Sequence, residues 1–265
     1  MRHFSGDLRA AVACAAVLGA AACSLDSSAP TGGGDCTRVG TVALGDTLRD
    51  SLVASSCRQA NGTYAAFYAI QVDSPQSQVR LALASGAPAF MVLGDARNAI
   101  IVNSLYTDTL GTTAAIRIIA KGGRYVIGVN SGGQAPSGAF SLTFARDSSP
   151  VRGCTPIWVT TGITTAQTLT ASDCTFGPQG TKYYTHLYLA VILGNEELRL
   201  TEHTTAFPPQ AQLVGQNGQT AGLSSLDSTG ANAVVDFVPS TDNLLLMWLG
   251  SSDSLQTGAY TLTIK

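Results

Sequence analysis

The stretch Leu52-Val-Ala-Ser-Ser-Cys57 recurs as Leu169-Thr-Ala-Ser-Asp-Cys174, 117 residues later. A second cysteine precedes each copy, Cys36 before the first and Cys154 before the second. Further matches follow in the same order, and all are offset by 117 to 120 residues. A period of this length is that of a whole small domain and not of a solenoid unit. The chain therefore predicts two copies of one domain. The match that closes the copies is Gly138-Ala-Phe-Ser-Leu-Thr-Phe144 with Gly258-Ala-Tyr-Thr-Leu-Thr-Ile264.

The repeat sets the expected domain organisation of the 265 residues. We expect one domain at residues 36–148 and another at 153–265, with a short, turn-rich join between them. Residues 1–22 are expected to be a lipoprotein signal peptide. Residues 23–35 are rich in Ser, Gly and Pro and have little to bury, which predicts a flexible tether.

The repeated cysteines predict two disulfide bonds. Each copy has its own pair about 20 residues apart, so the simplest pairing is Cys36 with Cys57 and Cys154 with Cys174. Closing a loop of that size stabilises a domain by roughly 3 kcal/mol in the chain-entropy model. A zinc site would need two more ligands in each copy, whereas the exported chain has only two histidines, both in the second copy.

The N-terminal residues have the pattern of an export signal. Arg2 and Arg9 supply positive charge, and the run Ala10–Ala22 is apolar but too short to span a bilayer as a helix. The small residues directly before Cys23 resemble the bacterial lipobox, in which that cysteine receives a diacylglycerol, although Ala20 stands where the motif usually has Leu. Cleavage after Ala22 by ordinary signal peptidase, which would release a secreted protein, is the alternative.

The cysteine count favours lipidation of Cys23. Once the other four exported cysteines pair, Cys23 is left over, and a free thiol in an oxidising compartment needs an explanation. Acyl chains contribute roughly 0.8 kcal/mol per buried CH₂, so two or three of them anchor a protein stably in a membrane. Ser24 replaces the Asp that retains many lipoproteins at an inner membrane. We therefore expect a lipid-anchored protein of the cell envelope, at the outer membrane or the cell surface.

The exported chain has strand patterns and no helical apolar period. Segments rich in Val, Ile, Thr and aromatic residues are separated by turn residues, and Lys121-Gly-Gly123 is expected to be one such turn. The pattern predicts an all-β chain of two tandem antiparallel β-sandwich domains with seven or eight strands each. The expected strands are Tyr64–Val72, Gln78–Ala84, Ala89–Leu93, Ala99–Val102, Ala114–Ala120, Tyr125–Val129 and Gly138–Phe144, then Tyr183–Leu193, Leu198–Thr201, Gln212–Gly215, Ala233–Val238, Leu244–Leu249 and Ala259–Ile264.

Each copy also resembles a known family. The aromatic strands Tyr64-x-x-Phe67-Tyr68 and Tyr184-x-x-Leu187-Tyr188, the segment from Lys121 to Val129 and the closing Gly-Ala-aromatic strands are similar to those of the bacterial pre-peptidase C-terminal domain. The resemblance covers nearly all of the exported chain and implies a jelly-roll-like β-sandwich. It also implies an accessory role in secretion, targeting or ligand contact. The second copy departs from the pattern at Ser240–Asn243, which replaces Lys-Gly-Gly.

Charge and motifs argue against catalysis and against nucleic-acid binding. Charged residues are 12% of the chain, the formal net charge is −2, and no basic run is present. His186 is expected to face solvent or a polar groove, His203 to lie in a loop, and Glu202 with Glu196 and Glu197 to form a solvated turn. No nucleophile elbow, metalloprotease helix or phosphate loop occurs, so we expect neither an enzyme nor a cofactor or resident metal. A calcium site that uses one of the scattered aspartates, Asp95, Asp108, Asp236 or Asp242, is the open alternative.

Aromatic residues of the second copy supply the candidate ligand contacts. Trp248 aligns with Gly128 of the first copy, and it is expected, like Trp158, to pack in the core or between domains. If Trp248 is instead exposed together with Tyr183 and Tyr184, the three form a platform for stacking sugars. The sequence therefore leaves three functions: an envelope lipoprotein that contacts proteins or polysaccharides without catalysis, a carbohydrate-binding module, and a secreted hydrolase or its accessory protein.

Lipidation is tested directly at the mature N-terminus. Mass spectrometry of the exported protein is expected to show a diacylglycerol on Cys23, because that is the thiol without a disulfide partner. Cys23→Ala is expected to release the protein from the membrane fraction. An unmodified N-terminus at Cys23 would show that the signal is cleaved without acylation.

Overall fold

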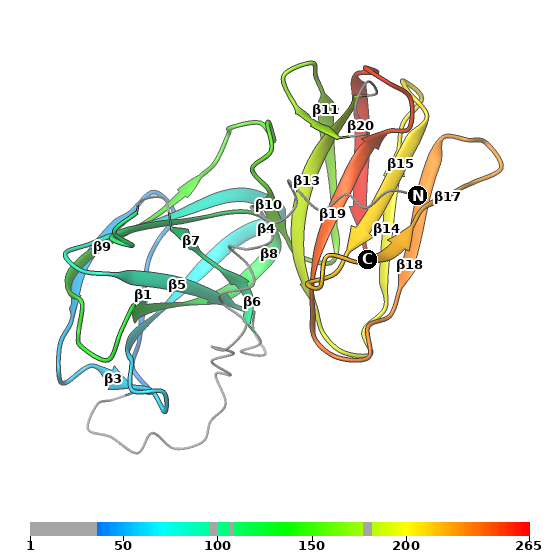
Figure 1. Cartoon of the computed structure of the whole chain (residues 1–265). Helices are drawn as coiled ribbons and strands as arrows, with labels where there is room; N and C mark the ends of the chain where they lie inside the picture. Colours follow the sequence, from blue (N-terminus) through cyan, green and yellow to red (C-terminus); the bar gives the residue numbers. More distant parts are fainter. Residues whose placement is uncertain (1–35, 96–99, 107–108, 177–181) are drawn as a thin grey trace. The chain divides into compact units, whose positions relative to one another are not determined.

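The computed structural model describes residues 36–95, 100–106, 109–176 and 182–265, so Cys23, the expected signal peptide and the tether lie outside the described residues. In those ranges the regular elements are β-strands, and the described chain is all-β (Figure 1). No helix there has the length and apolar character that crossing a bilayer requires. The chain separates between Ser149 and Pro150 into two compact units, called the N unit and the C unit.

The described part of the N unit is a sandwich of two sheets. Its strands are β1 (Val39–Thr41), β2 (Thr47–Leu52), β3 (Cys57–Arg58), β4 (Tyr64–Ser85), β5 (Ala89–Gly94), β6 (Ile100–Asn103), β7 (Leu105–Tyr106), β8 (Thr113–Ser131) and β9 (Gly138–Arg146). One sheet has the order β6–β5–β8–β4, with β1 and β3 along the other edge of β4. The other has the order β7–β8–β4–β9–β2. The long strands β4 and β8 therefore take part in both sheets.

A bulge lets β4 and β8 bend from one sheet into the other. Their antiparallel register shifts once, between Val72 and Gln76 of β4. On β8 the facing backbone is so close that a Cβ atom on Gly122 would lie 2.5 Å from Cα of Ser74. Lys121–Gly123 is therefore part of β8, and the expectation of a turn between separate strands was wrong. An inserted bulge with a glycine opposite it bends a strand without ending it, which local sequence does not distinguish from a turn.

The C unit repeats this strand order with more interruptions. Its strands are β10 (Ile157–Val159), β11 (Ile163–Leu169), β12 (Cys174–Phe176), β13 (Tyr183–Ile192), β14 (Leu198–His203), β15 (Pro209–Val214), β16 (Thr220–Leu223), β17 (Ser225–Leu226), β18 (Asn232–Phe237), β19 (Asn243–Ser251) and β20 (Gly258–Ile264). One sheet has the order β16–β15–β19–β13, with β10 and β12 along the other edge of β13. The other has the order β17–β18–β14–β20–β11. Here β13 with β14, and β18 with β19, take the places of β4 and β8.

Matching strand order makes residues of the two units comparable by register. Leu187 faces Trp248 across β13 and β19, as Phe67 faces Gly128 across β4 and β8. Two features of each unit depart from the expectation. The sheets are not wholly antiparallel, since β1 pairs with β4 and β10 pairs with β13 in parallel. The short strands before each long central strand were also missed, because β2 and β11 are polar and β1, β3, β10 and β12 have only two or three residues, too few for an alternation.

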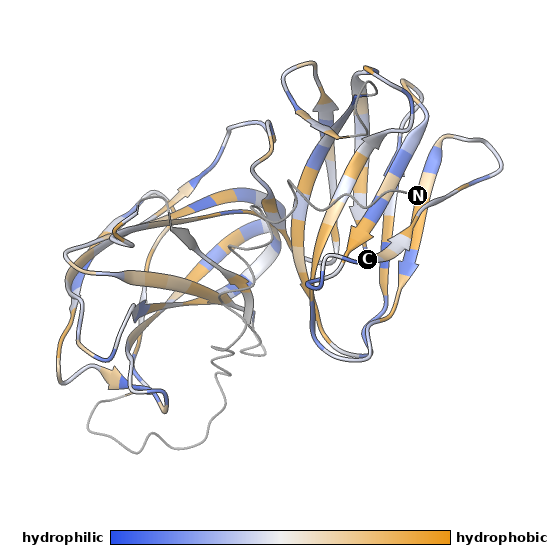
Figure 2. Cartoon of the chain, in the orientation of Figure 1, coloured by the Kyte–Doolittle hydropathy of each residue, from blue (hydrophilic) through white to orange (hydrophobic). Residues whose placement is uncertain are grey.

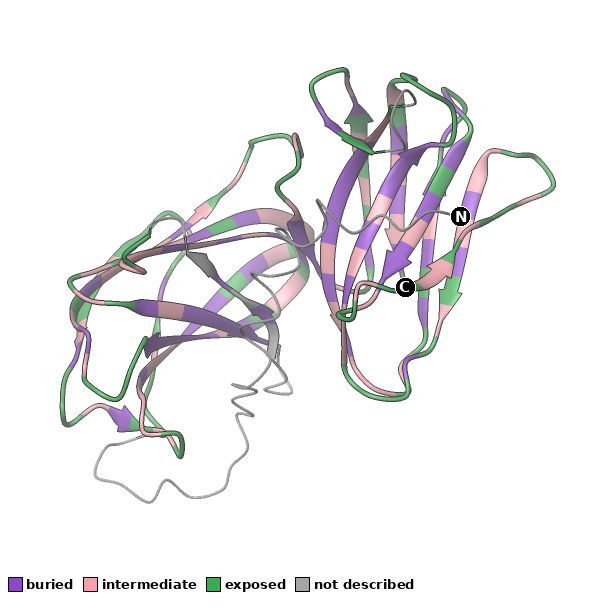
Figure 3. Cartoon of the chain, in the orientation of Figure 1, coloured by how far each residue is buried: buried purple, intermediate pink, exposed green. Residues whose placement is uncertain are grey.

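The core of each unit follows from the period-2 alternation of its strands (Figures 2 and 3). In β9 the buried positions are Phe140, Leu142 and Phe144, and between them lie half-buried side chains. Full burial of such a side chain contributes roughly 1.5–3 kcal/mol. Both expected disulfide bonds are present, Cys36–Cys57 in the N unit and Cys154–Cys174 in the C unit. Each bond joins the start of its unit to the short strand β3 or β12.

The close approach at the bend predicts a specific cost. Gly122→Ala is expected to lower the free energy of unfolding by about 1–3 kcal/mol, because its Cβ would overlap the backbone of Ser74. Gly133→Ala is the matched control, since a Cβ there meets no atom within 4 Å. The two are compared with the unchanged protein by urea denaturation. Equal midpoints for both variants would contradict the proposed packing at the bend.

Candidate functional site

A pocket of about 380 Å³ lies on the face of the C unit that turns away from the sandwich interior. Its residues come from four neighbouring strands of one sheet, and in β15 and β19 alternation explains which side chains they present. In β15 and β19 the side chains of Ala211 and Leu249 are buried in the core, so their neighbours point to the other face. The lining residues are Phe176 of β12, Tyr183, Tyr184 and Thr185 of β13, Gln210 and Gln212 of β15, and Trp248, Gly250, Ser251 and Ser252 of β19 and the turn after it.

One wall of the pocket is aromatic. The rings of Phe176 and Trp248 meet edge to face, with their centroids 4.2 Å apart. Phe176 is 42% exposed, and Trp248, Tyr183 and Tyr184 are partly exposed. The structure thus brings together the three residues that were expected to form a platform if exposed. Phe176 was missed by the sequence argument, although a large apolar residue that follows Cys174 in a polar segment was a usable signal.

The rest of the pocket lining is polar and uncharged. Gln210 and Gln212 present amide groups, and Nε2 of Gln212 donates to Oγ1 of Thr220 at 2.8 Å. Ser251 accepts a hydrogen bond from the backbone N–H of Asp253 at 3.0 Å. Among the described residues, no Asp, Glu, Lys, Arg or His side chain lines the pocket. The site therefore offers ring faces and neutral hydrogen-bonding groups to a ligand and no side-chain charge.

The N unit has different residues in the equivalent places. Gly128 stands for Trp248, and a Cβ on Gly128 would meet a methyl group of Val92 at 2.9 Å and the ring of Phe67 at 3.3 Å. Val92 takes the place of Gln212, because Val92 pairs with Gly128 and Gln212 pairs with Trp248. Phe90 likewise stands for Gln210. The space that holds the tryptophan in the C unit is therefore filled by apolar side chains in the N unit.

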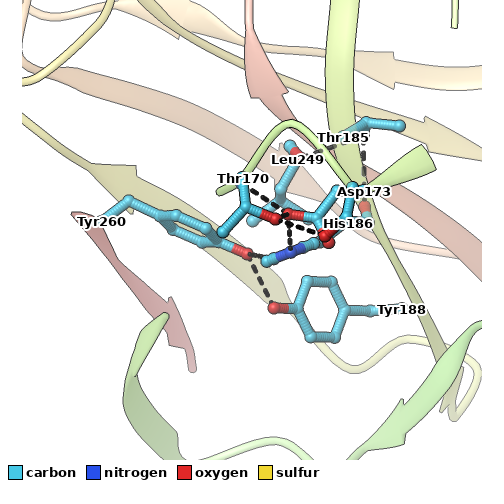
Figure 4. A network of polar contacts seen from close by, with 8 residues as sticks. Thr170, Asp173, Thr185, His186, Tyr188, Leu249 and Tyr260 are labelled. Atoms are coloured by element: carbon cyan, nitrogen blue, oxygen red, sulfur yellow. Dashed lines mark hydrogen bonds and ion pairs between the residues drawn. The ribbon is translucent and has the colours of Figure 1, made fainter. Parts of the chain in front are cut away.

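On the interior side of the same sheet, His186 belongs to a chain of polar contacts (Figure 4). Nδ1 of His186 lies 2.6 Å from the hydroxyl of Tyr260, which lies 2.7 Å from the hydroxyl of Tyr188. Nε2 of His186 lies 3.1 Å from Oδ2 of Asp173. That carboxylate oxygen accepts hydrogen bonds from the backbone N–H of Thr170 at 2.6 Å and from its hydroxyl at 2.9 Å. His186 and Tyr188 have no exposed surface.

These contacts favour a neutral imidazole. Burial lowers the pKa of His186 below its ordinary value of 6.5, and the charge and hydrogen bond of Asp173 offset part of that effect. Burial also raises the pKa of both Tyr188 and Tyr260, so both phenols stay protonated. With its proton on Nε2 toward Asp173, His186 accepts at Nδ1 from Tyr260, which accepts in turn from Tyr188. Nε2 of His186 faces Asp173, but neither this nitrogen nor Oδ1 of Asp173 makes a hydrogen bond of standard geometry within the described residues.

Glu202 is a second ionisable group in this interior. It follows Leu198 and Leu200 on the inward face of β14 and is 0% exposed. Its carboxyl oxygens make no hydrogen bond of standard geometry within the described residues. Burial raises the pKa of Glu202 well above 4.5, and the backbone groups of Gly250 and Gln210 reduce that effect. Gly250 and Gln210 also line the pocket, so Glu202 lies next to the pocket on its interior side.

Three expectations about these residues were wrong. His186 was expected to face solvent, but it is two residues from Tyr188 in the same strand and shares its inward face. Glu202 was expected in a solvated turn and lies instead in a strand, buried. His203, expected in a loop, is the last residue of β14; it is exposed as foreseen, with Nδ1 2.8 Å from Oδ1 of Asn232.

The buried polar cluster of the C unit is not repeated at the equivalent positions of the N unit. In the N unit the tyrosine is kept as Tyr68, whose hydroxyl donates to Asp50 at 2.7 Å. The other four positions carry no ionisable side chain. By register they are Ser56 for Asp173, Ala66 for His186, Leu83 for Glu202 and Phe140 for Tyr260.

The described residues include no group of three or more His, Cys, Asp and Glu placed to hold a metal ion. Asp108, one of the four aspartates considered for calcium, lies outside the described residues. Asp242 accepts a hydrogen bond from the backbone N–H of Gly194 at 2.8 Å, and Asp236 lies 3.7 Å from Arg199. These two carboxylates therefore already have partners of their own.

No family model and no curated protein matches the chain. Among solved structures, the pre-peptidase C-terminal domain of collagenase from Bacillus anthracis aligns at 16% identity and a TM-score of 0.32, over 40% of this chain and 94% of that one. The PBSX exported protein XepA aligns at 11% identity and 0.26, over 83% and 87%. A cycloisomaltooligosaccharide glucanotransferase from Paenibacillus sp. aligns at 10% and 0.24, over 77% and 46%. Scores of this size do not establish a shared family, so membership in the pre-peptidase C-terminal family stays a prediction.

The buried Glu202 predicts a stability change with a defined pH dependence. The folded state keeps the proton on Glu202 at a pH where the unfolded chain has lost it, so stability falls as the pH rises above 4.5. Glu202→Gln removes this cost and is expected to raise the free energy of unfolding by about 1–3 kcal/mol at pH 7, with little gain below pH 4. Glu197→Gln, at an exposed position, is the control for denaturation at each pH. A gain that does not depend on pH would count against a buried, protonated Glu202.

Proposed function

We propose that the protein is an exported binding module that contacts neutral glycans through the aromatic pocket of its C unit and performs no catalysis. The observation that carries the proposal is the pocket itself, in which the Phe176 and Trp248 rings stand beside uncharged amide and hydroxyl groups. The volume of about 380 Å³ falls within the range of small-molecule sites.

The chemistry of the lining matches a saccharide. The C–H face of a pyranose packs on an aromatic ring, while its hydroxyl groups exchange hydrogen bonds with neutral amides and hydroxyls. Gln210 and Gln212 are two residues apart on one strand, so their amides lie on the same face and can address neighbouring hydroxyls. An acidic sugar would bring a carboxylate to a pocket with no cationic side chain among its described lining residues, which favours neutral glycans.

The case against catalysis rests on where the ionisable groups lie. A general base must reach the proton it abstracts, and His186 is fully buried in the sandwich. His203 is exposed, but its ring contacts Asn232 at the end of a strand and lies outside the pocket lining. We therefore propose a binding role in preference to a hydrolase role. If the protein shows hydrolase activity and a His186→Ala/His203→Ala double variant keeps that activity, these two histidines are not its catalytic residues.

Export and anchoring complete the proposal. Two disulfide bonds favour an oxidising compartment outside the cytoplasm. With the lipidation of Cys23 proposed above, the module would be held at the cell envelope by a tether and would present the pocket to polysaccharides or glycoproteins. Partners other than glycans would use surfaces outside this pocket.

A glycan array of neutral and acidic oligosaccharides tests the proposal. Binding to at least one neutral glycan is expected, and Trp248→Ala and Tyr184→Ala are each expected to weaken it at least tenfold, because each removes a ring from the pocket. Tyr64→Ala is the matched control, since Tyr64 occupies the place of Tyr184 in the N unit. The proposal would be overturned by a chain that is folded yet binds no glycan, or by equal loss in Tyr64→Ala.

A further inference from the structure

We propose that Asp173, His186 and Tyr260 form an acid-sensitive latch that holds the Phe176 wall of the pocket in place. The inference rests on the proposed function of the pocket and adds a regulatory device to it. Its basis is the position of Asp173. The Asp173 carboxylate contacts the buried His186, and the strand β12 that directly follows Asp173 carries Phe176 of the pocket.

Few interactions position the strand that carries Phe176. β12 has three residues, which pair with Thr185, Tyr184 and Tyr183 of β13. Its first residue, Cys174, is fixed by the disulfide bond to Cys154. Directly before it, Asp173 caps the turn that begins at Thr170 and reaches across to His186. The Asp173–His186 contact thus ties the turn before β12 to the central strand β13.

The N unit shows that the same turn forms without a latch. There Ser56 replaces Asp173, and its hydroxyl accepts from the backbone N–H of Val53 at 3.0 Å, just as Asp173 accepts from Thr170. Ala66 replaces His186, so β4 has no imidazole at this position to contact the turn. The cap needs only a short acceptor, and the carboxylate–imidazole contact is an addition of the C unit.

Within the described part of the chain, ionisable groups contact His186 from three elements. Asp173 approaches from the turn before β12, Tyr188 from β13 itself, and Tyr260 from β20. Glu202 of β14 acts on Tyr188 and Tyr260. Strands β11, β15 and β19, which complete the two sheets here, carry no titratable side chain.

The direction of the pH effect follows from burial. In the closed state burial lowers the pKa of His186, whereas in a locally opened, hydrated state the imidazole titrates near 6.5. Below that pH the opened state binds a proton that the closed state resists, so the ratio of opened to closed molecules rises by up to about tenfold per pH unit. Protonation also reverses the hydrogen bond at Nδ1, which forces Tyr260 to give up its role as donor to His186. Glu202 acts in the opposite sense, since its protonation favours the closed state.

Hydrogen–deuterium exchange of the full chain, without ligand, tests the latch. Exchange is compared at pH 7.5 and 5.5, corrected for the intrinsic rate, in peptides that cover Thr170–Phe176. We expect protection of this segment to fall by up to about tenfold at pH 5.5 and to stay unchanged in the matched segment Val53–Gln59 of the N unit. His186→Gln is expected to abolish the acid effect, and Glu202→Gln to keep it.

Each outcome decides the proposal. Equal protection of Thr170–Phe176 at both pH values in the unchanged protein, or the same acid effect in His186→Gln, would overturn it. If His186→Gln does not fold, Asp173→Asn replaces it and is expected to lower protection of Thr170–Phe176 already at pH 7.5, because its contact with His186 is weakened, and to leave Val53–Gln59 unchanged. Protection of Thr170–Phe176 equal to that of the unchanged protein at pH 7.5 would overturn the proposal. Since no glycan is present, failure of the glycan array would overturn the proposed function and leave this result standing.

Discussion

The pairing of two central antiparallel strands holds each sandwich together. In the N unit β4 and β8 remain paired through both sheets, and the Asp73–Pro75 bulge opposite Gly122 allows them to bend from one sheet to the other. In the C unit the same path is divided into β13 with β19 and β14 with β18. Because side chains alternate along these strands, their register decides which residues enter the core and which face outward.

Within that shared frame, a few substitutions give the two units different surfaces. Where the N unit has Gly128 beside Val92, the C unit has Trp248 beside Gln212. In the C unit a large ring, Trp248, thus lies beside the amide of Gln212, and both residues line the pocket. Two units with the same strand order can differ in this way, because outward positions contribute little to the core.

The interior of the C unit has diverged at a higher energetic cost. Burying Glu202 without well-formed hydrogen bonds destabilises the fold, whereas Leu83 at the equivalent place in the N unit stabilises it. The imidazole of His186 lies between a carboxylate and a phenol, yet its Nε2 and Oδ1 of Asp173 also make no hydrogen bond of standard geometry within the described residues. These ionisable groups adjoin the pocket, whose lining includes Gly250 and Phe176.

The sequence by itself determined the all-β class and both disulfide bonds, because strand alternation and cysteine spacing are local patterns. It also singled out Tyr183, Tyr184 and Trp248 as candidate contacts. Only the tertiary structure decided that these rings share a pocket with Phe176, since strands distant in sequence meet there. It likewise decided that His186 and Glu202 are buried. The local sequence around a polar residue in a short strand does not indicate whether its side chain faces the core or solvent. That is decided by which face of the strand packs against the second sheet.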